Sequence, residues 1–438
     1  MGNSDYIWLA KPAPRYTSYP TAPNFHEGVN AEAYLNALEN ISGADPISLY
    51  VHVPFCRSLC LYCGCHTSIT QRKDRIDAYL TAVKKEISIL SSKIGNRLKV
   101  SHLHFGGGSP NIMSDDQIKD LFSTLNRSFD FFPRSEIAME LDPRLVSKDQ
   151  IYTLAKYGVT RVSLGVQDFN SNVQQAVNRE QSYSIIADIC DWVRSAGIKG
   201  INFDLMYGLP LQTPATIVET MQHVVNLVPD RISFFSYAHV PQLKKHQLEL
   251  EKYGLPDKHT LLDLEQAGRE VLLAADYVAI GMDHFAKPND SMTIALCERR
   301  LRRNFQGYTD DVAETILGIG ASSIGFAGNK YFQNERDVEK YQEIITGGNL
   351  ATVRGVGLSQ DDKLRAKIIS DLMCYMECAV DMLVGETKKL EPFYKAGIVE
   401  IKNSKICLKT RHRTAVRAIC QLFDIYVGKA GVVQSKMG

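Results

Sequence analysis

The stretch Tyr50-Val-His-Val-Pro-Phe-Cys-Arg-Ser-Leu-Cys-Leu-Tyr-Cys-Gly-Cys65 decides how the rest of the chain is organised. Its first residues are apolar and β-branched, which predicts a buried strand that runs directly into a group of cysteines. The four thiols follow the spacing C-x3-C-x2-C-x-C, at Cys56, Cys60, Cys63 and Cys65. Thiolates so close in sequence can surround one compact inorganic centre, so we expect a metal-binding loop at a strand end.

Zinc and disulfides are the alternatives to an iron-sulfur centre for these thiols. A zinc ribbon usually places its two cysteine pairs about 15 to 20 residues apart, and this loop holds one cluster only. Disulfides are disfavoured because the chain is long and the other cysteines, of ten in all, are scattered. The N-terminus also lacks the basic and then apolar layout of a signal peptide. The pattern favours iron-sulfur and leaves zinc and structural thiols open.

Length and composition predict an ordinary cytoplasmic protein. A chain of 438 residues is long enough for two or three domains, and 45% of it is hydrophobic and 23% charged. No apolar run approaches the roughly 20 residues that span a bilayer. The formal net charge of +1 creates no field for nucleic acid. We therefore expect partners that include neither membrane nor nucleic acid.

Six units of a short β-rich run followed by an amphipathic run predict the fold. Such alternation is typical of an α/β protein with a parallel sheet. Strands are expected at 47–54, 100–105, 136–141, 161–166, 200–205 and 231–237. Helices are expected at 74–94, 114–128, 147–157, 182–196, 213–227 and 259–276. Six units leave a (β/α) barrel incomplete, because the closed form has eight.

The expected strand ends are unusually polar. In parallel barrels the functional residues come from the C-terminal ends of the strands. Here those ends carry Phe105-Gly-Gly-Gly-Ser-Pro110, Glu140-Leu-Asp-Pro143, Gln167-Asp-Phe169 and Asn202-Phe-Asp204. Each could be a turn or a helix cap, but together they indicate a ligand site. The glycine run lacks a Walker lysine and is not a phosphate loop.

The motif C-x3-C-x2-C, with an aromatic residue beside the third cysteine, resembles that of the radical S-adenosylmethionine (SAM) enzymes. The resemblance covers nearly the whole chain. It extends to Pro14-Arg-Tyr-Thr-Ser-Tyr-Pro-Thr21, Cys65, Gly281-Met-Asp-His-Phe-Ala-Lys-Pro288 and Arg303-Asn-Phe-Gln-Gly-Tyr-Thr309. With these segments the chain is similar to the oxygen-independent coproporphyrinogen III oxidases.

This resemblance implies a domain organisation. Residues 46–300 would form an open partial TIM barrel of six (β/α) units that admits a large substrate from the side. Residues 1–45 would be an N-terminal extension covering the active-site mouth. Residues 301–438 would be a mainly helical C-terminal domain, with a short β piece near 399–408, that covers the barrel.

The resemblance also implies the cofactors. Cys56, Cys60 and Cys63 would bind three irons of a 4Fe-4S cluster and leave the fourth iron open for SAM, whereas Cys65 belongs to the motif without being a ligand. With Tyr50, these three cysteines are the expected catalytic residues. Two SAM molecules are expected, with Gln167, Arg179 and Asp204 at the second. The full set of expected contacts is Tyr50, Tyr62, Gly107, Gly108, Ser109, Glu140, Gln167, Arg179, Asp204, Ala238, Gln306 and Ile324.

The implied reaction is the conversion of two propionates of coproporphyrinogen III to vinyl groups, giving protoporphyrinogen IX, by a 5′-deoxyadenosyl radical. A monomer that receives electrons from a flavodoxin or ferredoxin is expected. The basic run Arg299–Arg303 is either a solvated helix face or a contact for the anionic substrate, because guanidinium groups bind carboxylates. A radical SAM haem chaperone and a SAM-dependent haem-degrading methyltransferase are the alternative functions.

Overall fold

Parallel strands alternate with outer helices along most of the chain in this computed structural model, which describes residues 13–379 and 386–428. The ends of the expected extension and C-terminal domain, 1–12 and 429–438, and residues 380–385 lie outside the described residues. All six predicted strands are present and pair in parallel in chain order. They are β1 (Ile47–Val53), β4 (Lys99–Gly107), β5 (Asp130–Leu141), β6 (Arg161–Gln167), β7 (Gly200–Tyr207) and β8 (Arg231–Ser236).

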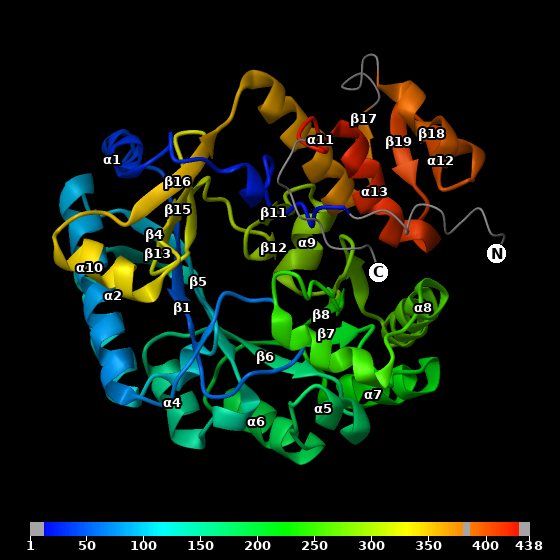
Figure 1. Cartoon of the computed structure of the whole chain (residues 1–438), viewed down its shortest axis with the longest axis horizontal. Coiled ribbons are helices and arrows are strands. Elements are labelled where there is room, and N and C mark those ends of the chain that lie inside the picture. Colours follow the sequence, from blue (N-terminus) through cyan, green and yellow to red (C-terminus); the bar gives the residue numbers. More distant parts are fainter. Residues whose placement is uncertain (1–12, 380–385, 429–438) are drawn as a thin grey trace.

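The six predicted helices cover the outside of this sheet (Figure 1). Ser114 caps one of them and Thr213 another, each through a reciprocal bond with the residue three positions on. Pro214 follows as the first helical residue, where its missing N–H costs nothing. The helices are α2 (Lys73–Ile94), α3 (Asp115–Ser128), α4 (Lys148–Lys156), α6 (Tyr183–Ser195), α7 (Pro214–Leu227) and α8 (Lys258–Ala274), with the short α5 (Ser171–Ala176) before α6.

The sheet extends beyond the six units on both sides. Within the described residues it has twelve strands, in the order β16-β15-β14-β13-β1-β4-β5-β6-β7-β8-β10-β9. One edge is completed by β9 (Val278–Ile280) and β10 (His284–Ala286), which follow α8. The other edge comes from much later in the chain: β13 (Thr315–Ile319), β14 (Ile324–Ala327), β15 (Lys330–Asn334) and β16 (Thr352–Gly357).

The expected boundary at residue 300 therefore needs correction, because residues 315–357 contribute strands to the same sheet as the barrel. β13 pairs in parallel with β1, whereas β14, β15 and β16 pair antiparallel. These strands are short and interrupted by glycine, so they carry little β signal. A side chain does not fit at Gly318, because a Cβ there would lie 2.8 Å from the backbone carbonyl carbon of Ile324 on the neighbouring strand.

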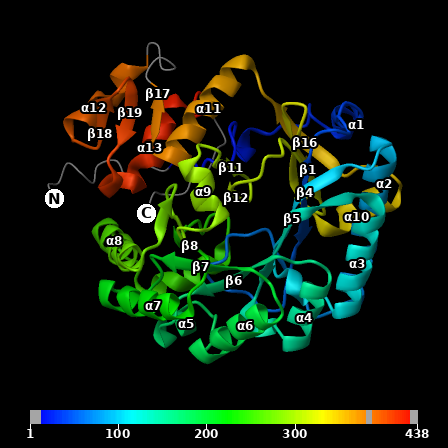
Figure 2. The same ribbon diagram turned by 180° about the vertical axis from the view of Figure 1, so that it is seen from behind.

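The C-terminal part of the chain packs against the N-terminal segment. Its elements are α11 (Gln360–Tyr375), β17 (Glu377–Ala379), α12 (Glu391–Lys395), β18 (Val399–Lys402), β19 (Lys405–Leu408) and α13 (Val416–Cys420). Ala13, Tyr16 and Tyr19 are buried in the same apolar cluster as residues of α11 and α13. Figures 1 and 2 show α11 beside α9 (Ser291–Cys297) and the strand β11 (Arg302–Asn304). The two chain ends are thus joined through one small core.

The remaining elements are short and connect these parts. β2 (Phe55–Cys56) and β3 (Ser68–Ile69) pair across the base of the cysteine loop, and β11 forms a hairpin with β12 (Gly307–Thr309). α1 (Ala31–Glu39) and α10 (Val338–Thr346) pack near the β15–β16 edge (Figure 1). In the described residues no helix is long and apolar enough to cross a membrane.

Candidate active site

A cavity of about 800 Å³ lies at the C-terminal ends of the parallel strands. Parallel barrels bind their ligands at this end. Of the predicted site residues, the cavity is lined by Cys56, Cys60, Tyr62, Cys63, Gly107, Gly108, Ser109, Glu140, Gln167, Arg179, Asp204, Ala238 and Gln306. Tyr50 and Ile324 do not line it; the hydroxyl of Tyr50 instead bonds His52 Nδ1 at 3.0 Å. The structure thus brings together residues from six separate strand ends and from the β11–β12 hairpin.

The cysteine loop is held by bonds to its backbone carbonyls. His246 Nε2 lies 2.8 Å from the carbonyl oxygen of Cys63, and Gln247 donates to that of Tyr62 at 3.0 Å. Both belong to a 3-10 helix, Lys245–Tyr253, that follows β8. Lys244 donates to the carbonyl of Cys65. Sequence reasoning missed this support, because Lys244-Lys-His-Gln247 is far from the loop in sequence and carries no motif.

The thiols themselves are surrounded by hydrogen-bond donors. Every cysteine of the described chain is free. Arg179 and Arg144 donate to Cys60 Sγ at 3.4 and 3.5 Å, and Ser109 donates to Cys56 Sγ at 3.5 Å. The Cys65 thiol, together with the charges of Lys244 and His246, lowers the pKa of Cys63 to about 6 despite burial. Burial raises the pKa of the Cys56 thiol to about 11, in contrast to that of Cys63. Donors and cations beside sulfur stabilise thiolates, so the surroundings of Cys63 suit a thiolate-ligated cluster.

The glycine loop gives close access to the backbone. Gly107 has φ of +117°, and a Cβ at this residue would lie 2.5 Å from the imidazole of His52. A Cβ on Gly108 would lie 2.6 Å from the carbonyl of Phe55. The N–H groups of residues 107, 108 and 109 already donate within the protein. A ligand ammonium, which needs acceptors, therefore suits this loop better than a ligand carboxylate does.

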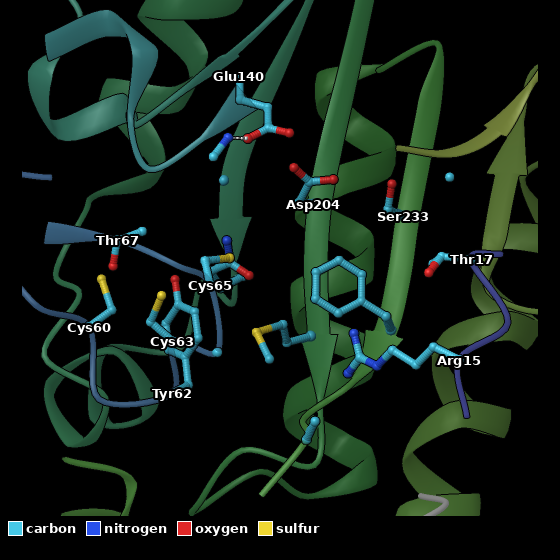
Figure 3. Close-up of a pocket in the computed structure, with 18 of the residues that line it drawn as sticks. Arg15, Thr17, Cys60, Tyr62, Cys63, Cys65, Thr67, Glu140, Asp204 and Ser233 are labelled. Atoms are coloured by element: carbon cyan, nitrogen blue, oxygen red, sulfur yellow. Dashed lines mark hydrogen bonds between the residues drawn. The ribbon is translucent and has the colours of Figure 1, made fainter. Parts of the chain in front are cut away.

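Glu140 on β5 and Asp204 on β7 both face the cavity (Figure 3). Burial would raise the pKa of Glu140, but the bonds from His104 Nε2 and Gly107 N–H, both at 3.1 Å, lower it overall. Burial raises the pKa of Asp204 above its usual value, although Ser163 donates to it at 2.7 Å. Two carboxylates with opposite pKa shifts thus line one cavity.

Arg179 and Gln167 occupy the floor beside the cysteines. Arg179 is buried and donates to the carbonyl of Gly165 at 2.7 Å, and it lies 3.5 Å from a carboxylate oxygen of Asp142. Gln167 is buried in a left-handed conformation with φ of +66°. Its Oε1 has no hydrogen-bond partner among the described residues. A buried unpaired carbonyl oxygen in a cavity wall indicates that a ligand donor completes it.

Comparison with known proteins identifies the class first. The sequence model of the radical SAM superfamily matches residues 50–224, which include the cysteine loop and the first strand ends. The fold and the site therefore define a radical SAM protein.

The particular family follows from relatives that match almost end to end. The chain is 43% identical to the oxygen-independent coproporphyrinogen III oxidase of Bradyrhizobium diazoefficiens, over 97% of this chain and 96% of that protein. It is 37% identical to the one from Escherichia coli, over 96% and 94%. The solved structure of coproporphyrinogen III oxidase from Escherichia coli, described as a radical SAM enzyme, matches with a TM-score of 0.89 and 38% identity, over 94% and 98%. The chain belongs to the oxygen-independent coproporphyrinogen III oxidase family.

The family, the partial-barrel fold and the cofactor pair of a 4Fe-4S cluster and SAM are thereby confirmed as predicted. The individual contacts to these cofactors stay predictions.

Proposed function

We infer that this chain is an oxidoreductase of haem biosynthesis that converts coproporphyrinogen III to protoporphyrinogen IX without oxygen. One observation carries the inference. A single cavity joins three cysteines of the radical SAM motif to the segments Pro14–Thr21 and Arg303–Thr309, which mark the coproporphyrinogen oxidases. The cysteines would hold the cluster that the radical chemistry needs, and the two segments would form a place for a large anionic substrate.

Cys56, Cys60 and Cys63 would bind the 4Fe-4S cluster. When bound, cluster and SAM would supply removal of a hydrogen atom from a substrate propionate, so that loss of carbon dioxide, with one electron passing to an electron acceptor, leaves a vinyl group. Arg144 and Arg179 donate hydrogen bonds to Cys60 Sγ, so two guanidinium groups lie beside one of the expected cluster ligands. The protein would thus hold the three cysteines in place and orient the cluster and SAM.

Glu140, near the C-terminal end of β5, would bind SAM. Its lowered pKa keeps it ionised at neutral pH, so it acts as an acceptor for ribose hydroxyls or the ammonium group. Gly107, Gly108 and Ser109 would lie against the methionine part, Tyr62 and Ala238 against the nucleoside. Tyr50 and Ile324, which do not line the cavity, are proposed as SAM contacts on the resemblance alone.

A second SAM is proposed beside Gln167, Arg179 and Asp204. The unpaired Oε1 of Gln167 supports a donor ligand there. Arg179 already donates to the carbonyl of Gly165 and to Cys60 Sγ, which leaves fewer of its N–H groups for the carboxylate of that SAM.

We also propose that the protein is a cytoplasmic monomer that takes electrons from a flavodoxin or ferredoxin. The choice of donor rests on the chemistry of the reaction, which needs a low-potential one-electron donor.

An anaerobic product analysis tests the proposed function. Reconstituted protein incubated with SAM, a reductant and coproporphyrinogen III should yield, after oxidation, protoporphyrin together with 5′-deoxyadenosine. Stoichiometric haem binding without vinyl product would replace the oxidase with a haem chaperone. Methyl transfer to haem with ring opening would indicate the methyltransferase.

A further inference from the structure

The basic run Arg299–Arg303 is divided by the fold into surface and cavity residues. Arg299 pairs with Glu377 and Arg300 with Glu298, both on the outside. Arg303 instead lines the cavity from the β11–β12 hairpin, with its guanidinium 4.4 Å from the ring centre of Tyr308. Its Nε and Nη1 are buried without a hydrogen-bond partner in the described part of the chain.

Arg15 approaches the same cavity from the N-terminal segment. Figure 3 shows its side chain reaching into the cavity from the wall opposite Cys60, Cys63 and Cys65. Its hydrogen bond, to the carbonyl of Ser236, is long at 3.4 Å. No carboxylate of residues 13–379 or 386–428 lies within ion-pair distance of it. The guanidinium is therefore placed at the cavity but not neutralised.

Arg417 holds Arg15 in this place. It is buried in α13, lines the cavity and donates to the carbonyls of Pro14 and Ala13, the residues directly before Arg15. Burial and the charge of Arg15 lower the pKa of Arg417 to about 10. Arg15, Arg303 and Arg417 are named the arginine cluster here.

Around the arginine cluster, cationic side chains outnumber the carboxylates that interact with them. Asp283 is the carboxylate that Arg15, Arg303 and Arg417 share as a charged neighbour, and its Oδ1 is already 2.7 Å from His284 Nδ1. Arg15 and Arg303 thus share one carboxylate that is already bonded to a histidine. The Nε and Nη1 atoms of Arg303 are held away from bulk water. A buried cation without a matching anion is costly, so such a group is retained where a ligand supplies the anion.

We propose that Arg15 and Arg303 bind the carboxylates of the propionates that the reaction leaves intact, and that Arg417 positions Arg15. This inference rests on the proposed function. The reacting propionate must face the cysteine side, where the radical forms, and Arg15 lies on the other side. A carboxylate lost as carbon dioxide would give up its contact, whereas retained carboxylates anchor the ring through both conversions. Binding energy from such remote groups positions the reacting carbon.

The test compares Arg15→Gln and Arg303→Gln with Arg302→Gln. Arg302 is in the same hairpin, but it is exposed and bonds the carbonyl of Ala313. Loss of a charge-assisted bond should raise the KM for coproporphyrinogen III about 10- to 100-fold in each cavity variant. Arg302→Gln should stay within about twofold. Iron content and SAM affinity should match the wild type in all three, which shows that the variants are folded, and Arg303→Lys should recover part of the loss.

A substrate derivative separates binding from a structural effect. Coproporphyrinogen III with methyl esters on its two retained propionates should bind the wild type about as weakly as the free acid binds the double variant Arg15→Gln/Arg303→Gln. In this double variant the ester should cost much less, because both arginine partners are gone. An equal ester penalty in wild type and variant, or an unchanged KM in both cavity variants, would overturn the proposal. A wild type that forms no vinyl product would overturn the proposed function itself.

Discussion

Replacing Glu140 with glutamine tests the cofactor side of the cavity. The two side chains have almost the same shape, and the amide oxygen can still accept the N–H of Gly107 that lies 3.1 Å from the carboxylate. What is lost is the negative charge and one acceptor. Because the pKa of Glu140 is lowered, the wild-type carboxylate is ionised over the whole neutral range. Loss of a hydrogen bond to a charged group costs about 1.5 to 3 kcal/mol, or roughly 10- to 100-fold in the Kd for SAM.

The assay is anaerobic equilibrium dialysis with SAM on reconstituted protein, with iron and sulfide counted in the same samples. Glu180→Gln is the matched control, since Glu180 is exposed and outside the cavity lining. Glu140→Gln should keep its cluster and lose affinity, whereas Glu180→Gln should keep both. A Kd in Glu140→Gln within twofold of the wild type, with the cluster intact, would remove Glu140 from the site.

Three further results are expected. Alanine at Cys56, Cys60 or Cys63 should abolish the cluster while Cys65→Ala keeps it, measured by iron and sulfide content; stoichiometric zinc without iron in anaerobic wild type would refute the cluster. Gln306→Ala should leave cluster assembly intact but lower vinyl formation by on the order of 100-fold, because small misplacements of the reacting carbon are costly; unchanged turnover would contradict this. Burial raises the pKa of Glu86 to about 7, so its stabilising effect is complete below about pH 4.5 and is lost as pH rises through 7. Urea titrations from pH 5 to 8 should therefore show the wild type losing roughly 2 kcal/mol of unfolding free energy that Glu86→Gln keeps; parallel curves would disprove this.

Local signals explain why the barrel and much of the site could be predicted. The six strands are apolar runs ended by polar residues, and each is followed by one of the six helices before the next of these strands begins. The order of the strands in the sequence is therefore their order in the sheet. Glu140 and Asp204 needed only their place at strand ends. The cysteine loop needed only its spacing.

Features that depend on distant pairing could not be predicted. β13 joins β1 across more than 250 residues of sequence, which a local pattern does not encode. His246 supports the cysteine loop from a 3-10 helix for the same reason. From the sequence, the basic run is either a solvated helix face or a substrate contact. The fold decides between them residue by residue: the β11–β12 hairpin places Arg303 at the cavity, whereas Arg299 lies at the surface. Arg417 meets Pro14 only because both chain ends share one core.

Transfer of a labelled hydrogen tests the central claim most directly. Coproporphyrinogen III with deuterium at the β-carbon of its reacting propionates is incubated anaerobically with the reconstituted protein, SAM and a reductant, and 5′-deoxyadenosine is analysed by mass spectrometry. The account predicts 5′-deoxyadenosine that carries one deuterium and protoporphyrin after oxidation. Unlabelled 5′-deoxyadenosine alongside protoporphyrin, or no protoporphyrin at all, would contradict it.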